Sequence, residues 1–255
     1  MNAQDLADRL NEELRTTAYA DIDGSPNGLQ VGPGDAVVET AAAAVDASAA
    51  TIDAAITADA DMLLTHHGLW WEGTDRVTGI TYDRLKRLLD AELPLYVAHL
   101  PLDGHQEYGN AAGLADVLDL RARAPFGAFG AEYIGQQGHL PESLRCSELV
   151  DRLATELPHG GQRVQVLDHG PAVVDHVAIV TGSGVDYLQE AVDAGADVLV
   201  TGEGKQVAYH ESRELGINLV LAGHYATEVF GVTSLLELLG TWGIDEEFLQ
   251  HPTGL

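Results

Sequence analysis

The chain has 255 residues, 45% of them hydrophobic, which is enough to bury one large core or two modest ones. Forty Asp and Glu against thirteen Lys and Arg give a formal net charge of −27, which excludes the basic patch of a nucleic-acid-binding protein. The acids are scattered rather than gathered in a tail, so they favour adaptation to a high-salt cytoplasm over an acidic partner-binding surface.

The sequence shows no sign of a membrane protein or a secreted protein. No stretch approaches the roughly 18 uninterrupted apolar residues of a membrane span. The N-terminal residues MNAQDLADRLNEEL predict an amphipathic helix rather than a signal peptide. One cysteine, Cys146, excludes an internal disulfide and fits a reducing compartment. We therefore expect a cytoplasmic protein that binds neither nucleic acid nor membrane.

Short apolar runs alternate with amphipathic stretches along the chain, which is typical of an α/β fold with mostly buried strands. A Gly- and Phe-rich stretch, residues 124–130, is expected to join a first α/β half, residues 1–124, to a second, residues 125–255. Residues 27–32 are interpreted as a turn entering a strand. The predicted strands are 37–45, 61–65, 95–99, 132–138, 163–167, 176–181, 197–201 and 218–223. The predicted helices are 2–15, 47–58, 81–91, 108–118, 145–156, 184–194, 205–214 and 225–239.

A weak internal repeat relates the two halves. Residues 60–68 (ADMLLTHHG) match residues 196–204 (ADVLVTGEG), and residues 95–99 (LYVAH) echo residues 219–224 (LVLAGH). The shared order of these segments favours a duplicated unit over chance similarity. The repeat also aligns the carboxyl ends of the predicted strands, which is where open parallel sheets bind ligands.

Histidines and carboxylates gather at these predicted strand ends. His66 and His67 directly follow a buried strand, Asp103 follows another, and His224 and Glu228 are four residues apart on one helix face. Imidazole and carboxylate together suit zinc, iron or manganese. Adjacent side chains diverge from an extended strand, so each histidine is expected to hold its own ion. A carboxylate such as Glu228 could then bridge two ions about 3.5–4 Å apart.

Four further polar residues lie near the same strand ends. His99 and His105 flank Asp103, where they are candidates for catalysis or for simple solvation of the strand ends. Glu203 and Lys205 occupy the positions where the first half carries its histidines, but the sequence leaves their roles open. The glycine-rich turns before them match no nucleotide-binding fingerprint, so we interpret them as tight turns between strand and helix.

The order and content of these motifs resemble one known family, the Nif-three-like dinuclear-metal hexamers, whose members often carry the label GTP cyclohydrolase 1 type 2 homologue. The resemblance covers nearly the whole chain and matches the family's short form. It is carried by DGSPNGLQVG (23–32), LLTHHGLWW (63–71), YVAHLPLDGHQEYGNAAGLA (96–115), VTGEGKQ (200–206) and GHYATEVFGV (223–232).

The resemblance implies two similar, interlinked α/β halves with mixed or parallel sheets, assembled as a toroidal homohexamer. It also implies two divalent metal ions per chain, with Glu228 as the bridging ligand. The implied ligands are His66, His67, Asp103, His224 and Glu228.

The function expected from this reading is metal-dependent hydrolysis of a small molecule, for which a nucleotide is one candidate. Two ions would lower the pKa of a water shared between them toward neutrality. In the cyclohydrolase version this water attacks C8 of the purine of GTP and opens the imidazole ring, with His99 or His105 as general acid. A phosphoester substrate fits the same site. The alternative is a non-catalytic metal-binding regulatory or scaffold protein.

Overall fold

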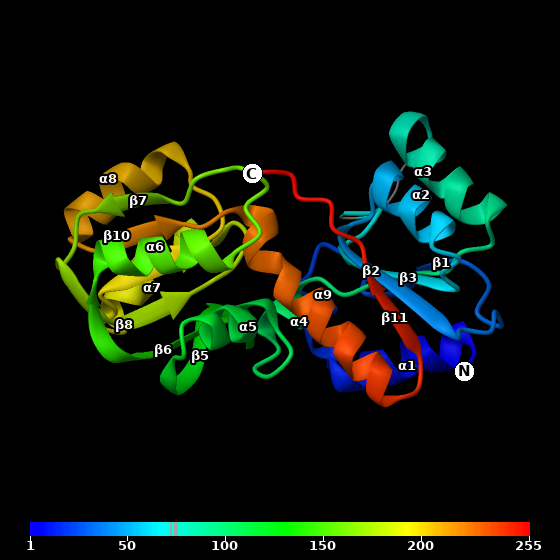
Figure 1. The fold of residues 1–255 in the computed structure, drawn as a ribbon, viewed down its shortest axis with the longest axis horizontal. Coiled ribbons are helices and arrows are strands. Elements are labelled where there is room, and N and C mark those ends of the chain that lie inside the picture. Colours follow the sequence, from blue (N-terminus) through cyan, green and yellow to red (C-terminus); the bar gives the residue numbers. More distant parts are fainter. Residues whose placement is uncertain (72, 74–75) are drawn as a thin grey trace. The chain divides into compact units, whose positions relative to one another are not determined.

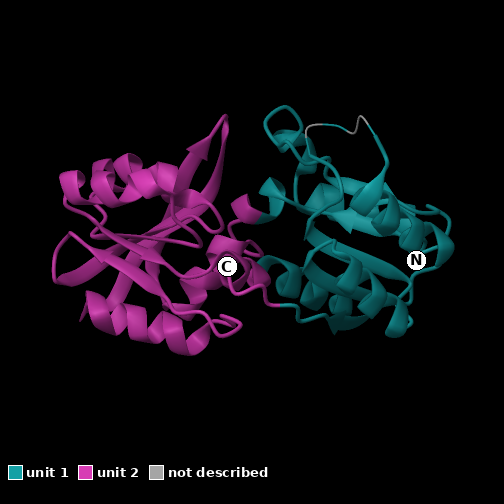
Figure 2. Ribbon diagram, turned by 90° about the horizontal axis from the view of Figure 1, so that it is seen from above, with its two compact units in different colours: residues 1–102, 231–251 teal, residues 103–230, 252–255 magenta. Residues whose placement is uncertain are grey.

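The computed structural model describes residues 1–71, 73 and 76–255, and the chain divides into two compact units (Figure 2). Unit 1 comprises residues 1–102 and 231–251, and unit 2 comprises residues 103–230 and 252–255. The division expected between residues 124 and 125 falls inside strand β5 (Arg121–Phe129) of unit 2. The chain therefore leaves unit 1 after residue 102, returns to it at residue 231 and passes back to unit 2 for residues 252–255.

Unit 1 is built on a mixed sheet with the strand order β1-β4-β3-β2-β11. Strands β4, β3, β2 and β11 run parallel, whereas β1 pairs antiparallel with β4 at one edge. Strands β2, β3 and β4 are mostly apolar because both of their faces are buried, whereas the edge strand β11 is acidic and mostly exposed. The bounds are β1 (Gly28–Val31), β2 (Thr40–Asp46), β3 (Met62–His67), β4 (Leu95–Val97) and β11 (Asp245–Phe248).

Helices cover both faces of this sheet. Helices α2 and α3 lie over one face, and α1 lies over the other (Figure 1). Helix α2 begins with a capping box, in which Ser48 and Thr51 satisfy each other's backbone N–H groups. Where α1 meets the C-terminal part of unit 1, the guanidinium of Arg9 lies 3.6 Å from the ring centroid of Trp242. The helices are α1 (Ala3–Glu13), η1 (Thr16–Tyr19), α2 (Ala49–Thr57) and α3 (Gly79–Asp90).

Unit 2 contains a second mixed sheet with the strand order β5-β6-β8-β9-β10-β7. Strands β8, β9 and β10 run parallel, and β7 pairs antiparallel with β10 just as β1 pairs with β4 in unit 1. On the other side of β8, the antiparallel β5–β6 hairpin extends the sheet. The bounds are β5 (Arg121–Phe129), β6 (Glu132–Arg145), β7 (Gln165–Asp168), β8 (Val173–Ile179), β9 (Val198–Thr201) and β10 (Asn218–Leu221).

A hydrophobic core packs against the sheet of unit 2. Val177 and Val198 face a core shared with Leu114 and Leu149 of two covering helices. The helices of this unit are α5 (Asn110–Val117), α6 (Cys146–Glu156), η2 (Gly184–Tyr187), α7 (Leu188–Asp193) and α8 (Gln206–Leu215). Two further helices, α4 (Leu100–Gly104) and α9 (His224–Thr241), contain the points at which the chain passes from one unit to the other.

A shared aspartate supports the internal repeat at the level of structure. One carboxylate oxygen of Asp61, Oδ2, accepts the backbone N–H groups of Glu39 and Thr40, each at 2.9 Å. Asp197 is the residue aligned with Asp61 in the repeat. Its Oδ2 accepts the backbone N–H groups of Asp175 at 2.8 Å and His176 at 3.0 Å. In each half, an aspartate just before one parallel strand thus binds the backbone of the preceding strand where the parallel pairing of the two begins.

The mixed α/β architecture with two sheets confirms the predicted fold class, but some elements differ from expectation. The interpretation of residues 124–130 as a joint is wrong, because they form most of β5. Glycine is needed there for close packing, since a Cβ at Gly127 would press on Val180. The acidic strand β11 was not predicted. Within residues 1–71, 73 and 76–255, no helix is long and apolar enough to cross a membrane.

Candidate metal centre

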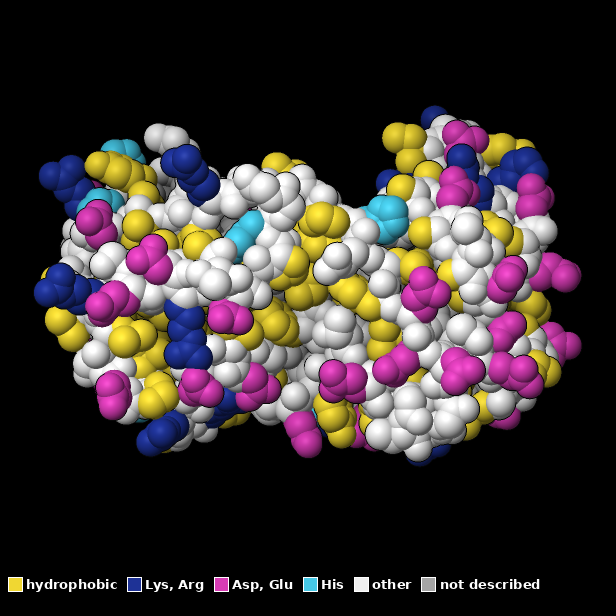
Figure 3. Space-filling model, in the orientation of Figure 1, with side chains coloured by type: hydrophobic (Ala, Val, Ile, Leu, Met, Phe, Trp, Pro, Cys, Tyr) yellow, Lys and Arg dark blue, Asp and Glu magenta, His cyan; other side chains and the backbone are white. Residues whose placement is uncertain are grey.

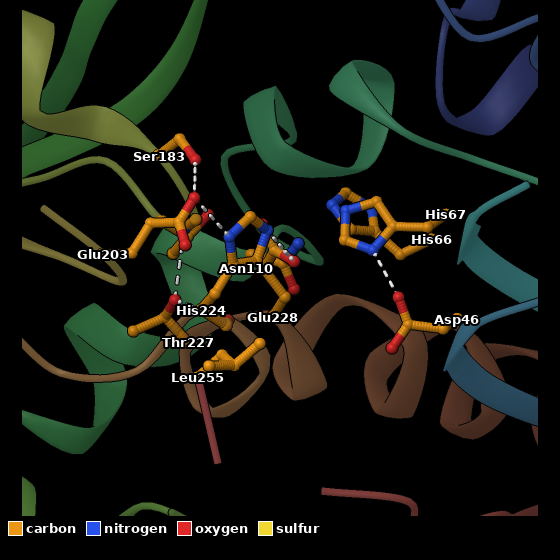
Figure 4. Close-up of polar contacts among 12 residues, drawn as sticks. Asp46, His66, His67, Asn110, Ser183, Glu203, His224, Thr227, Glu228 and Leu255 are labelled. Carbon is orange, nitrogen blue, oxygen red and sulfur yellow. Dashed lines mark hydrogen bonds and ion pairs between the residues drawn. The ribbon is translucent and has the colours of Figure 1, made fainter. Parts of the chain in front are cut away.

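His66 and His67 close strand β3, and their rings lie together. His66 is fully buried, and its ring centroid is 4.6 Å from that of His67. The expectation that adjacent side chains would diverge is wrong here. Alternation sets the direction of the Cβ atoms, but each imidazole is turned by a hydrogen-bond acceptor on the neighbouring strand end. In Figure 4 the two rings overlap in the view, at the end of the same strand.

Both rings are fixed through Nδ1. His66 Nδ1 lies 2.9 Å from the carbonyl oxygen of Ala98, just after β4, and His67 Nδ1 lies 2.9 Å from Oδ1 of Asp46, the last residue of β2. A carbonyl or carboxylate oxygen accepts only, so Nδ1 carries the proton in each neutral ring. The lone pair is therefore on Nε2, which is the arrangement that metal-binding histidines use.

His99, predicted as a catalytic residue, belongs to the same cluster. Its ring centroid lies 5.1 Å from that of His66 and 5.8 Å from that of His67. The potential metal-binding atoms of the three histidines all lie within 4.8 Å of one another. The indole of Trp71 borders the cluster, with its ring centroid 4.8 Å from that of His99.

A loop at the start of β1 surrounds His99. Asp23 Oδ1 accepts from His99 Nδ1 at 2.8 Å, and its side chain is only 1% exposed. Burial alone would raise the pKa of Asp23, but hydrogen bonds from His99 and Asn27, and the charge of His99, hold it below its ordinary value. Asn27 Oδ1 in turn accepts the backbone N–H of His99 at 2.7 Å.

In unit 2, two hydrogen-bond donors bind one carboxylate oxygen of Asp103. Its Oδ1 accepts from the amide Nδ2 of Asn110 at 2.8 Å and from the hydroxyl of Thr181 at 3.2 Å. Asp103 and Asn110 are both buried. These two donors hold the carboxylate of Asp103 in place through Oδ1.

His224 and Glu228 occupy one face of the first turn of α9. His224 Nε2 lies 3.2 Å from Glu228 Oε2, and His224 Nδ1 lies 3.3 Å from Glu203 Oε1. Glu203 also accepts from the hydroxyl of Ser183 at 2.5 Å, and this bond helps to hold the pKa of Glu203 below its ordinary value. Figure 4 shows Glu203 between Ser183 and His224. The carboxylate oxygens of Asp103 and Glu228 lie within 4.8 Å of each other.

The two carboxylates determine the charge on His224. Burial disfavours the protonated ring, but the hydrogen bond and negative charge of Glu228, together with those of Glu203, raise the pKa of His224 to about 9. At neutral pH the metal-free ring is therefore an imidazolium between two carboxylates. Any metal ion that binds His224 must first displace this proton.

Gly182 makes room for this pair. Its φ of +59° lies in the left-handed region, and a Cβ at this position would overlap Glu228 Oε1 and approach His224 Nε2 to 3.2 Å. The backbone N–H of Gly182 donates to the hydroxyl of Thr227 at 3.2 Å. The sequence predicted only a tight turn here. The structure shows that the absence of a side chain at Gly182 leaves space for His224 and Glu228.

The remaining candidates are engaged in contacts of their own. His105 Nδ1 accepts the backbone N–H of Tyr108 at 2.9 Å, so the neutral ring carries its proton on Nε2. The ring also stacks on that of Tyr108, with centroids 4.7 Å apart. Lys205 forms a solvent-exposed ion pair with Asp186 at 2.5 Å. The catalytic role of His105 stays a prediction, and Lys205 is a surface residue.

The donor set in each unit fits a divalent transition metal. Unit 1 offers imidazoles with fixed tautomers, and unit 2 offers one imidazole and two oriented carboxylates, a mixture that suits zinc, iron or manganese. Sequence reasoning found the donors but not the residues that orient them. Asp46, Asp23 and Thr181 carry no spacing signal, because their roles depend on strand pairing and loop closure.

Comparison with known proteins shows the family. The model of the Duf34/NIF3 family (NGG1p interacting factor 3) matches residues 1–251. The chain belongs to the Duf34/NIF3 family. A relative from Halobacterium salinarum, named GTP cyclohydrolase 1 type 2 homolog, is 55% identical over 255 residues, covering all of both chains. A relative from Deinococcus radiodurans with the same name is 40% identical and covers 96% of this chain and 92% of its own.

Solved structures agree with this assignment. A crystal structure of a Thermus thermophilus protein is 37% identical to this Duf34/NIF3 chain, covers all of both chains and superposes with a TM-score of 0.88. A protein described as ybgI, of unknown function, is 34% identical with a TM-score of 0.90, again over all of both chains. The resemblance seen in the sequence motifs is therefore confirmed at the level of the family and the fold.

Proposed function

We propose that this Duf34/NIF3 chain is a metal-dependent hydrolase with a dinuclear centre. The proposed ligands are His66 and His67 of unit 1 and three residues of unit 2, Asp103, His224 and Glu228. The observation that supports the proposal most is the set of hydrogen bonds behind these donors. A carbonyl or carboxylate oxygen orients each histidine through Nδ1, and Asn110 and Thr181 hold one oxygen of Asp103. Such preorganisation is what metal centres require.

Two ions would activate a water molecule and polarise the bond that this water attacks. The chain's own contribution is placement and proton transfer. His105 carries its proton on Nε2 and is the candidate general acid, since backbone N–H groups occupy its Nδ1. Asp46 and Glu203 orient His67 and His224. The buried side chains of Asp103 and Glu228 limit the access of bulk water.

The names of the relatives suggest the substrate class. Several relatives are named GTP cyclohydrolase 1 type 2 homolog, so hydrolytic opening of the imidazole ring of a purine nucleotide is the first reaction we propose. Hydrolysis of a phosphoester is the second, because two ions can clamp the attacking and leaving oxygens of such a substrate.

A non-catalytic role, in metal storage or as a regulatory scaffold, is the alternative, and one observation favours it. His66, Asp103 and Glu228 are 0%, 7% and 3% exposed. Closed metal sites of this kind are common in structural roles, whereas catalytic sites keep an open position.

The proposal extends to assembly and location. We propose a toroidal homohexamer in the cytoplasm of a cell with high internal salt, in keeping with the family resemblance and the charge of −27. Light scattering in molar potassium chloride tests the assembly. A mass near six times 27.1 kDa supports the hexamer, and a stable monomer contradicts it.

The catalytic proposal is tested by elemental analysis and turnover on the same preparations. Protein purified in molar salt without chelator should carry two ions per chain, and Glu228→Gln should lose at least one of them. Metal-loaded wild type is then assayed with GTP and p-nitrophenyl phosphate. Turnover that disappears in His105→Gln while both ions remain supports the hydrolase. Full metal loading without turnover of either probe favours the storage or scaffold role.

A further inference from the structure

The sheet of unit 2 carries a second pair of histidines, away from the candidate metal centre. We propose that His139 of β6 and His176 of β8 form a separate surface site that binds one divalent transition-metal ion. Two imidazoles as ligands suit copper(II) or zinc. The inference is independent of the proposed function, because neither histidine belongs to the candidate centre.

Strand pairing places the two histidines directly opposite each other. His139 and His176 are register partners in the antiparallel pairing of β6 with β8. Leu140 and Val177, the next residue along each strand, belong to the core, so alternation turns both histidines to the opposite face of the sheet. The two rings stack, with centroids 4.6 Å apart and 20° between their planes. The side chain of His139 is 49% exposed, so an ion can reach the pair from solvent.

Each ring has one nitrogen in a hydrogen bond and one nitrogen available to a metal. His139 Nδ1 donates to Oδ2 of Asp175 at 2.7 Å, and His176 Nε2 donates to the amide oxygen of Gln137 at 3.0 Å. These acceptors have no proton to give, so the neutral rings carry their lone pairs on His139 Nε2 and His176 Nδ1. Within the part of the chain that the structure describes, neither of these two nitrogens has a hydrogen-bond partner. The carboxylate of Asp175 also makes the ring of His139 a more basic ligand.

The local geometry allows the two rings to share an ion. Two nitrogens bound to one zinc ion lie about 3 Å apart. Stacked rings reach this separation when each turns about its Cβ–Cγ bond, which is a soft torsion. The backbone beneath is fixed, because Asp197 accepts the N–H groups of Asp175 and His176. Among the described residues, the groups of three or more potential metal ligands do not include this pair, so water completes the coordination.

The site lies at the opposite end of β8 from the candidate centre. His176 is near the start of the strand, whereas Thr181, which binds Asp103, follows its end. Five residues of extended chain span about 16 Å, so one ion cannot serve both places. The pairing of β6 with β8 shifts register between His139 and Leu144. An ion held by both histidines ties the two strands at the last pair before this shift, so its binding stabilises unit 2.

The test uses copper(II)–iminodiacetate as the probe. The chelator fills part of the coordination sphere of copper and leaves room for two neighbouring imidazoles, while its bulk disfavours the buried donors of the candidate centre. Pulsed electron paramagnetic resonance counts the coordinated imidazoles, and titration calorimetry gives the affinity. We expect two imidazoles and one complex per chain. His139→Phe and His176→Phe should each lower the count to one and weaken binding at least about 10-fold. His210→Phe, which removes an exposed histidine of α8, is the matched control and should change neither.

Unfolding midpoints measured without the probe show whether the variants fold. With saturating probe, the midpoint of wild type should rise, whereas the midpoints of His139→Phe and His176→Phe should stay where they were. Absence of binding in wild type, a count of one imidazole, or full affinity in either phenylalanine variant overturns the inference. A rise in midpoint that is equal in wild type and in both variants overturns it as well.

Discussion

At the scale of the residue, three histidines of the candidate centre each have one carboxylate beside their Nδ1 atom. Asp46, Asp23 and Glu203 each accept from, or lie beside, the Nδ1 of one histidine. Such partners fix the tautomer and the orientation of the ring and make its other nitrogen more basic. Holding these carboxylates in place costs conformational freedom and puts negative charge in partly buried positions. A histidine with a purely structural role would not require such a partner.

Asp46→Ala should weaken metal binding by about 10- to 100-fold, because His67 loses the acceptor that fixes its tautomer. The measurement is titration of metal-free protein with zinc in a competing chelator. Asp53→Ala is the control, since Asp53 pairs with Arg87 on an exposed surface. Equal affinity in the two variants would show that Asp46 does not act through His67.

The raised pKa of His224 predicts a pH dependence of the stability of metal-free protein. The ring's folded-state pKa of about 9 exceeds its ordinary value of 6.5, so protonation of the folded state stabilises it. The contribution is complete below pH 6.5, declines as pH rises, and is lost above pH 9. Urea unfolding of wild type and His224→Gln, from about pH 6 to pH 10, should show a difference that shrinks with pH. A constant difference contradicts the assignment.

At the scale of the element, one aspartate in each half ties neighbouring parallel strands together. Asp61 and Asp197 each accept two backbone N–H groups of the preceding parallel strand, just before the residues that pair with the next strand. Parallel strands lack a hairpin that could set their register, so this pair of hydrogen bonds supplies a local restraint. Asp61 and Asp197 are aligned in the sequence repeat and make the same hydrogen bonds, so both observations support a duplication.

Asp61→Ala and Asp197→Ala should each lower the free energy of unfolding by about 2 kcal/mol, because two N–H groups lose a charged acceptor. Urea unfolding measures the change. The corresponding Asn variants keep one acceptor oxygen and should lose less. Two substitutions that differ by more than threefold in effect would mean that the two aspartates do not play equivalent roles.

The elements that the sequence predicted best are those buried on both faces. Strands β3 and β9 begin with short apolar runs and are buried on both faces, so their positions follow from composition and length. Strand β11 (DEEF) is mostly exposed, and its pairing with β2 depends on a segment about 200 residues away. The metal-binding candidates were predicted because they interrupt apolar runs. Their orienting partners were not, because tertiary contacts alone bring them there.

At the scale of the whole molecule, the dominant quantity is the charge of −27. Acidic side chains are spread over the face of each unit shown in Figure 3 rather than collected in one patch. Many of them have no basic neighbour to balance them, since the chain has forty acids and thirteen bases. Their mutual repulsion opposes folding when it is not screened.

Salt should therefore stabilise the protein strongly. Raising potassium chloride from 0.1 M to 1 M shortens the Debye length from about 10 Å to about 3 Å. We expect the unfolding midpoint to rise by roughly 5–10 °C, equivalent to about 2–3 kcal/mol. Scanning calorimetry measures it, with sucrose at matched osmolality as the control. A midpoint that does not respond to salt contradicts adaptation of this surface to a salty cytoplasm.

The late return of the chain to unit 1 has a consequence for synthesis on the ribosome. Unit 2 is almost continuous, from residue 103 to residue 230, so it is free to fold as soon as that stretch has emerged. The sheet of unit 1 is incomplete until residues 245–248 pair with β2, which was made about 200 residues earlier. Unit 1 therefore begins to emerge before unit 2 but is completed after it, and the open edge of β2 stays unpaired until residues 245–248 have emerged.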